Sequence, residues 1–123
     1  MKGYRIALLT EEDGARERTE QTAVRNAAGE YLFAAENGDR FRVRCGPVCS
    51  VSREGEISYR MVFSPGECTE TVLETPYGTV RGRVRTYALE RREDGFSVVY
   101  ALGFPETEGR RKTDFRILPE VEI

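Results

Sequence analysis

The stretch Phe96-Ser97-Val98-Val99-Tyr100-Ala101-Leu102-Gly103-Phe104 places every large side chain except that of Val99 at an even position. Successive side chains of a β-strand point to opposite faces, so this alternation predicts a strand with one apolar face and one face of small residues. The same alternation recurs along the chain, at Tyr4, Ile6 and Leu8, at Tyr31 and Phe33, at Phe41, Val43 and Cys45, and at Ile57, Tyr59, Met61 and Phe63. No segment has convincing helical periodicity, and we therefore predict an all-β fold.

Turn sequences that contain glycine separate these segments. They are Glu12-Asp13-Gly14, Glu36-Asn37-Gly38-Asp39, Arg53-Glu54-Gly55, Ser64-Pro65-Gly66-Glu67, Pro76-Tyr77-Gly78, Glu93-Asp94-Gly95 and the segment from Pro105 through Gly109. In each we expect glycine to supply the positive φ of the turn. Between the turns we expect about eight to ten strands, and the number depends on whether Ala28-Gly29 bends one strand or separates two. We interpret the polar segment from Glu11 to Glu20 as a loop that joins the first two strands.

So many consecutive hairpins predict a closed sheet. An open sheet would leave exposed edges, and closure into a barrel removes them. The length of 123 residues matches one domain and is sufficient to bury a real core. We therefore predict a single antiparallel up-and-down β-barrel over residues 1–123.

Composition restricts the location and the partners. Hydrophobic residues make up 39% of the chain and charged residues 33%, a balance typical of a soluble globular protein. The net charge of −2 offers no general attraction to nucleic acid or to anionic membranes. Arg5 and the acidic residues 11–13 do not fit a signal peptide, and no apolar run approaches the roughly 20 residues that cross a bilayer. We expect a cytoplasmic protein with no membrane partner.

The residue types also exclude several kinds of chemistry. The chain contains no histidine, which excludes histidine-based catalytic triads and histidine-ligated metal or haem. Cys45, Cys49 and Cys68 are scattered and odd in number, and we expect buried free thiols rather than a zinc site. The carboxylates lie in turns and on charged faces, where burial is not expected to tune their pKa values. We therefore expect no metal, no cofactor and no enzymatic activity.

Short motifs across nearly the whole chain resemble a known family. They are Val51-Ser52-Arg53-Glu54-Gly55, Tyr59-Arg60-Met61-Val62-Phe63, Ser64-Pro65-Gly66, Glu74-Thr75-Pro76-Tyr77-Gly78, Thr86 and Tyr100. This pattern resembles the YwiB-like family of bacterial calycin-type barrels. The resemblance implies a lipocalin-like barrel and no activity, since the family is uncharacterised. One departure is the stretch from Arg40 to Cys49, where the family tends to carry a tyrosine and an acidic residue, so a ligand contact there would not carry over.

A small barrel encloses either packed side chains or one small ligand. By analogy with the fold, we expect non-catalytic binding of a small apolar or amphiphilic ligand in the lumen or at its mouth. Arg53 is the best candidate contact, because it shares parity with Cys49 and Val51 and can hold a carboxylate or phosphate bidentately. Additional hydroxyl contacts are expected from Tyr59, Tyr77, Thr86 and Tyr100.

Each of these expectations has an alternative. Arg53 could instead form a structural pair with Glu54, Glu56 or a backbone carbonyl, and a bulge between Val48 and Arg53 would reverse its parity. The aromatic side chains could fill the lumen. The protein would then be an interaction or structural module, including one that associates with a second copy of itself.

Two arginine rows raise a third hypothesis, weak binding of nucleic acid. Arg40, Arg42 and Arg44 share one strand face, and Arg81, Arg83 and Arg85 share another. We favour a solvated face over a nucleic-acid site, because Glu70 and Glu74 are expected opposite the second row as cross-strand ion pairs. The aromatic residues are also expected on the same strand faces as the other apolar residues. Proteins that bind single-stranded nucleic acid instead expose aromatic side chains on which bases stack.

Overall fold

The computed structural model of the chain describes residues 3–12, 14–104 and 107–118, apart from the side chains of 104 and 107–110. In this part of the chain all regular secondary structure is β-strand, and no helix could span a membrane. The strands are β1 (Gly3–Glu12), β2 (Ala15–Arg25), β3 (Glu30–Ala34), β4 (Arg40–Arg44), β5 (Cys49–Glu54), β6 (Tyr59–Phe63), β7 (Cys68–Thr75), β8 (Gly78–Arg92), β9 (Gly95–Phe104) and β10 (Thr107–Ile117).

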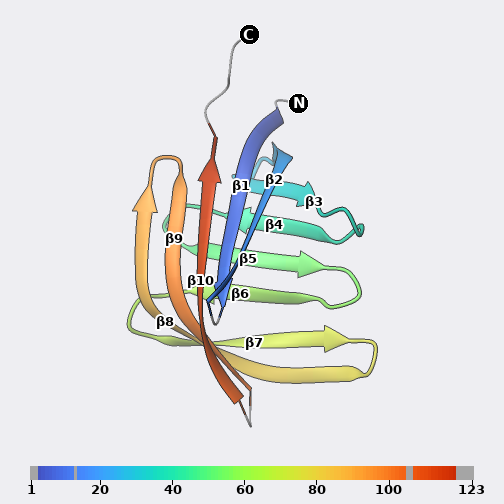
Figure 1. Cartoon of the computed structure of the whole chain (residues 1–123), viewed down its shortest axis with the longest axis vertical. Helices are drawn as coiled ribbons and strands as arrows, with labels where there is room; N and C mark the ends of the chain where they lie inside the picture. Colours follow the sequence, from blue (N-terminus) through green and yellow to red (C-terminus); the bar gives the residue numbers. More distant parts are fainter. Residues whose placement is uncertain (1–2, 13, 105–106, 119–123) are drawn as a thin grey trace.

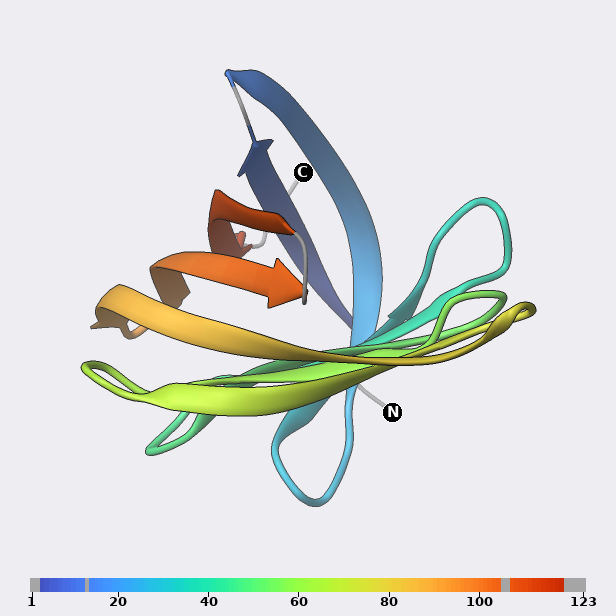
Figure 2. The ribbon, with the colours of Figure 1, turned by 90° about the horizontal axis from the view of Figure 1, so that it is seen from below.

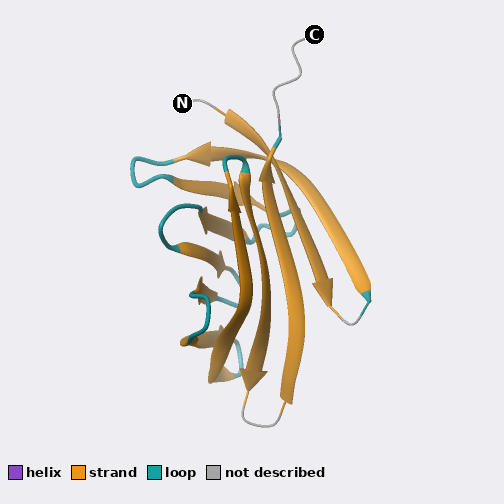
Figure 3. Cartoon of the chain, turned by 90° about the vertical axis from the view of Figure 1, so that its left-hand side faces the viewer, coloured by secondary structure: helices purple, strands orange, loops and turns teal. Residues whose placement is uncertain are grey.

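The strands form one antiparallel sheet that curls on itself. Its order is β6-β5-β4-β3-β2-β1-β10-β9-β8-β7, so neighbours along the chain are neighbours in the sheet and β1 also pairs with β10. Strands β6 and β7 are the two edges, and Figure 1 shows them side by side. Figure 3 shows the curvature that brings them together. The prediction of an all-β up-and-down barrel is confirmed, and the barrel is nearly closed.

The barrel is flattened into two layers whose strands cross (Figures 1 and 2). Strands β3 to β7 run across the view of Figure 1, and β1, β9 and β10 run along it in the other layer. Strand β8 belongs to both layers, because its first half pairs with β7 and its second half with β9. A register shift between Thr86 and Ala88 interrupts its pairing with β9. Such a bulge bends a strand and lets it turn the corner between crossed layers.

Side-chain hydroxyls help to close the seam between β6 and β7. At one end of the seam, Ser58 and Glu74 exchange two backbone hydrogen bonds, with N–O distances of 2.9 and 2.8 Å. Along the seam, the hydroxyl of Thr71 donates to the carbonyl oxygen of Arg60 at 2.9 Å. Thr69 donates in the same way to the next free carbonyl of β6, at 2.7 Å. These hydroxyls therefore replace backbone donors that the edge of β7 does not supply.

One end of the lumen is packed solid. Ile6, Val43, Phe63, Phe96 and Phe115 there have at most 2% of their surface exposed. Phe96 lies between the other two phenylalanines, with ring centroids 6.3 Å from Phe63 and 6.0 Å from Phe115. Burial of each such side chain contributes about 1.5–3 kcal/mol. The stable core of the barrel therefore lies at the end where β1 begins and β10 ends.

The alternation in β9 gives the expected faces. Phe96, Val98 and Tyr100 are buried, and Leu102 is half-buried and packs against the core. The side chain of Phe104, which the pattern places on the same face, lies outside the described residues.

The interpretation of Glu11 to Glu20 as a loop is wrong. Strand β1 continues to Glu12 and β2 begins at Ala15, and the two pair in register across the hairpin. Residues 15–18 are all exposed, since this part of β2 extends beyond the packed core. A strand with no buried face shows no apolar alternation, which is why the pattern indicated a loop.

Two of the predicted glycine positions differ in their role. Gly29, with a φ of 82°, separates β2 from β3, so the segment is two strands. Gly55 does not adopt the positive φ expected of it, unlike the glycines of five other predicted turns.

Cys49 is buried and Cys45 half-buried, but Cys68 is exposed, so the expectation of a buried thiol is wrong at that position. Its position on the outward face of β7 explains the exposure.

Replacing Thr71 by valine tests the closure of the seam. The change keeps the shape of a side chain that is only 3% exposed, but it leaves the carbonyl of Arg60 without its donor. We expect a loss of about 1–3 kcal/mol in the free energy of unfolding, measured with urea. The exposed Thr79 is the matched control, and Thr79→Val should change this free energy by less than about 0.5 kcal/mol. Equal effects of the two substitutions would contradict the role of the hydroxyl.

Candidate functional site

The other end of the lumen contains a cavity of about 800 Å³. Its lining comes from eight strands, β1 to β6 with β9 and β10, and from the β3–β4 loop. Apolar side chains, including Leu8, Phe33, Val51 and Met61, separate it from the packed core. Polar side chains surround the rest, and the exposed residues among them show that the cavity opens to solvent at the β1–β2 hairpin. The lumen is therefore filled at one end and hollow at the other.

The inward rows of the strands change character from the packed end to the open end. In β5 the row is Cys49, Val51 and Arg53, and in the paired strand β6 it is Phe63, Met61 and Tyr59. In β10 the row is Phe115, Thr113 and Arg111, with Tyr100 of β9 opposite Arg111. Because the registers of these strand pairs contain no shift, parity is kept along each row. The sequence thus builds an apolar floor and a polar mouth.

Arg53 faces the cavity and pairs with Asp39. Its side chain lies over the ring of Phe41, 5.8 Å from the centroid, and its Nε donates to Asp39 Oδ2 at 2.9 Å. Its Nη2 donates to the same oxygen. The inward orientation expected of Arg53 is confirmed, since no bulge intervenes. Its partner is a structural one, as the alternative anticipated, but it is Asp39 of the β3–β4 loop rather than a neighbour in the chain.

Asp39 is enclosed on every side, with 7% of its surface exposed. Its carboxylate accepts a hydrogen bond from Asn37 Nδ2 at 3.1 Å in addition to those from Arg53. These hydrogen bonds hold the pKa of the Asp39 carboxyl below its ordinary value, and the bond from Arg53 has the largest effect. A Cβ on Gly55 would clash with Asp39 Oδ1, so this turn needs glycine for close approach and not for its φ.

A second polar group lies on the β9–β10 wall. The hydroxyl of Tyr100 lies 3.4 Å from Thr113 Oγ1, a long contact in which either oxygen could donate. Arg111 Nη2 pairs with Glu12 Oε1 at 3.1 Å. Its Nε is buried and has no hydrogen-bond partner among the described residues. Buried donors without partners are rare in proteins, and each needs an explanation.

Burial raises the pKa values of the two tyrosines that face the cavity. Desolvation is the largest cause for Tyr59 and for Tyr100. Nearby charge on Arg111 opposes the rise at both phenols, and Arg53 opposes it at Tyr59. Both phenols are therefore neutral at ordinary pH and can donate a hydrogen bond. The positive charges of Arg53 and Arg111 are close enough to affect the part of the cavity between the two tyrosines.

The structure brings together three of the five expected contact residues. Arg53, Tyr59 and Tyr100 line the same cavity. Tyr77 is fully exposed at the β7–β8 turn, and it is not part of the lining. Thr86 is also absent from the lining, because its Oγ1 accepts a hydrogen bond from the Ser64 amide at 3.1 Å, where it helps to join β8 to the β6–β7 turn.

Sequence reasoning missed Arg111, Thr113 and Asp39. Arg111 stands among three adjacent basic residues, and its parity with Thr113 and Phe115 places it on the inner face. That parity is the signal that identifies it. No comparable signal exists for Asp39, because a loop brings it to Arg53.

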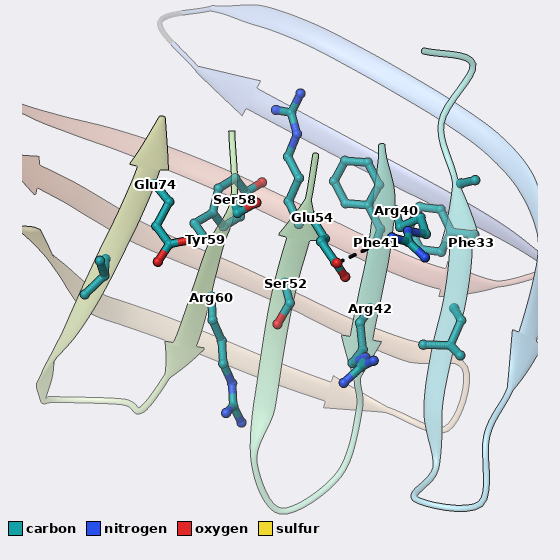
Figure 4. Close-up of a pocket in the computed structure, with 14 residues that line it drawn as sticks. Phe33, Arg40, Phe41, Arg42, Ser52, Glu54, Ser58, Tyr59, Arg60 and Glu74 are labelled. Carbon is teal, nitrogen blue, oxygen red and sulfur yellow. Dashed lines mark hydrogen bonds and ion pairs between the residues drawn. The ribbon is translucent and has the colours of Figure 1, made fainter. Parts of the chain in front are cut away.

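The outer face of β3 to β7 carries a shallow groove of about 650 Å³, shown in Figure 4. In and near this groove, the arginines of the first row, which lies on β4, each have an acidic or carbonyl partner. Arg40 lies 3.4 Å from Glu54, Arg42 lies 3.9 Å from Glu30, and Arg44 donates to the carbonyl of Ala28 at 3.5 Å. In the second row, Arg83 lies opposite Glu70 as expected, but Glu74 lies opposite Thr79.

Comparison with known proteins identifies the family. The sequence profile of DUF1934, described as a domain of unknown function, matches residues 35–108. The chain belongs to the DUF1934 family. Its fold is similar to the crystal structure of the YwiB protein from Bacillus subtilis, with a TM-score of 0.56, 14% sequence identity, and coverage of 95% of this chain and 91% of that one. The resemblance drawn from the motifs is thus confirmed, and at this identity the structural likeness shows the fold alone.

No protein with a curated description matches the chain in sequence. The function of this DUF1934 barrel must therefore be argued from its cavity. The described residues include no group of three or more side chains placed to hold a metal ion.

Acid titration tests the pairing of Asp39. The folded-state pKa of this carboxyl is lowered, so its contribution to stability is present above the ordinary aspartate pKa of about 3.9 and is lost as pH falls through the folded value. We expect Asp39→Asn to destabilise the protein most at neutral pH, with a difference from the wild type that shrinks below about pH 4. Urea unfolding across this range measures the difference. Glu36→Gln, an exposed change in the same loop, is the control, and a difference independent of pH would contradict the pairing.

A methyl group at Gly55 tests the close approach. Gly55→Ala must displace the carboxylate of Asp39 from its bonds with Arg53, whereas a Cβ at Gly46 meets nothing within 4 Å. We expect the pKa of Asp39, followed by carboxyl NMR, to move up toward its ordinary value in Gly55→Ala and to stay in place in Gly46→Ala. An unchanged Asp39 pKa in both variants would show that the loop can move away at no cost.

Proposed function

We propose that the protein binds a small amphiphilic molecule in the cavity at the open end of the barrel and does not convert it chemically. The cavity of about 800 Å³ is the observation that supports this proposal. Ligand sites are typically clefts of about 300–1,000 Å³ with mainly apolar walls and a few convergent polar groups. An apolar floor below a polar mouth matches a molecule with an apolar part and a polar head.

The hollow end also separates this proposal from the alternative of an interaction module with a filled lumen. A barrel of that kind would have continued the packing of Phe63, Phe96 and Phe115 to both ends. Here the inward rows become polar instead, although larger apolar side chains would pack these positions more stably. The presence of polar residues at these inward positions, despite the loss of stability, supports a role in binding.

Binding of nucleic acid receives less support. Each arginine of the β4 row lies near an acidic or carbonyl oxygen. A phosphate backbone would have to compete with these partners and would gain from no excess of positive charge on the chain as a whole.

The cavity favours binding over catalysis. The hydrogen bonds to Asp39, that from Arg53 above all, lower the pKa of its carboxyl, so it is a poor general base. The raised pKa values of Tyr59 and Tyr100 keep these phenols protonated. Burial, reinforced by the neighbouring Cys49, raises the pKa of the Cys45 thiol to about 12, so it is not a ready nucleophile. We propose a cytoplasmic location as well, because the three thiols are free and one of them is exposed.

Filling the cavity tests the proposal. N-phenyl-1-naphthylamine, a neutral probe that fluoresces in apolar surroundings, should bind the wild type and lose at least about tenfold in affinity in Met61→Trp. Met61→Phe is a milder second variant in case tryptophan overpacks the core. Val48→Trp, on an exposed position at the packed end, is the matched control and should bind like the wild type. A wild type that does not bind the probe, or a Met61→Trp variant that binds unchanged, would refute the proposal.

Native mass spectrometry of freshly purified protein gives an independent measurement. A small molecule lost on denaturation supports the proposal and reports its mass. An apo protein that forms a specific oligomer would favour the interaction module instead.

A further inference from the structure

The polar atoms at the depth of the cavity include a buried donor, Arg111 Nε, that no described acceptor satisfies. Asp39 Oδ2 accepts three hydrogen bonds, two from Arg53 and one from Asn37. The other carboxylate close to this group, that of Glu12, belongs to a side chain that is 50% exposed and pairs with Arg111 at the mouth. The floor residues contribute no acceptor. The contacts among the described residues therefore leave at least one buried donor of the inner wall, Arg111 Nε, without an acceptor.

Four donors line the same cavity. Arg111 Nε is buried without a partner among the described residues. Tyr100 and Thr113 share one long contact of 3.4 Å, which uses only one of their two hydroxyl protons. Tyr59 faces them from β6 across the cavity. A ligand that supplies acceptor oxygens here would satisfy groups that the protein leaves unpaired, and an unpaired buried donor costs about 1–3 kcal/mol.

Two guanidinium groups reach this space. Arg53 and Arg111 approach from opposite walls, β5 and β10. Both lower the pKa of Tyr59 against the larger effect of burial, so both fields reach its hydroxyl. Asp39 and Glu12 pair with Arg53 and Arg111, respectively, and offset much of their charge. An ammonium head would offer no acceptor to Arg111 Nε or to the tyrosine hydroxyls, whereas an anionic oxygen accepts strong hydrogen bonds from both kinds of donor.

We propose that the head group of the ligand is an oxyanion, a carboxylate or a phosphate, held by Arg111, Tyr100 and Tyr59 with its apolar part on the floor formed by Val51, Met61 and Phe33. This inference rests on the proposed function and specifies its ligand class. Arg53 contributes charge and is kept in place by Asp39. Arg111 is the direct contact, because its Nε supplies a donor in a fixed direction that a carboxylate or phosphate oxygen accepts.

Displacement of N-phenyl-1-naphthylamine by four amphiphiles with the same chain tests the head group. These are decanoate, decyl phosphate, decan-1-ol and decylamine, each used below its micelle concentration at about pH 7. We expect decanoate or decyl phosphate, or both, to displace the probe at concentrations at least about tenfold lower than decan-1-ol. Preference for one of the two anions identifies the head. Equal displacement by the alcohol, or preference for the amine, would overturn the inference while the proposed function stands.

Variants assign the effect to the residues. Arg111→Met should weaken the anion at least about tenfold and leave decan-1-ol within about twofold, because only the head contact is lost. Tyr100→Phe removes a single hydroxyl and should weaken the anion in the same selective way. Arg5→Met, the same substitution on an exposed side chain at the packed end, is the control. Loss of the anion and the alcohol together in Arg111→Met and in Tyr100→Phe would show a structural effect and refute head-group contact. Failure of the wild type to bind the neutral probe would refute the proposed function itself.

Discussion

Closure of the sheet at the β6–β7 seam is the constraint on which the rest of the molecule depends. Two edge strands must satisfy their backbone groups, and here Thr69 and Thr71 supply donors where the backbone of β7 does not. With the seam joined, ten strands enclose one interior, and the inward side chains of β5 and β10 face each other across it. Without it, the polar inner rows would lie on an open surface. The cavity is therefore a product of closure.

The interior is divided along the barrel axis. Aromatic and aliphatic side chains fill the end around Phe96 and Phe115, which supplies most of the buried apolar surface. At the other end, Arg53, Tyr59, Tyr100 and Arg111 stand in the same inward rows. Their charges and hydroxyls are matched only in part within the protein, which makes this end less favourable in isolation than an apolar filling. The packed end offsets that cost.

Most of the fold followed from alternation and from glycine turns, because period-two patterns report directly on which side of a strand is buried. Parity also placed Arg53, Tyr59 and Tyr100 on the inner wall correctly. Parity did not predict how far along the barrel axis a residue lies. Tyr77 lies at a hairpin tip and Thr86 lies on β8 beside the β6–β7 turn, and alternation carries no information on distance from the cavity. The pairing of Arg53 with Asp39 depends on loop geometry, and the exposed hairpin from Glu11 had no buried face to reveal it as strand.

The separation of core and cavity has an evolutionary consequence. Substitutions around the open end alter few of the contacts that keep the barrel folded, so that end can diverge while the packed end holds the architecture constant. Homologous barrels can then acquire cavities of different shape and polarity through a handful of changes at the ends of their inward rows. Low sequence identity between similar barrels, such as the 14% shared with the Bacillus subtilis protein, is compatible with a fold kept by its packed end.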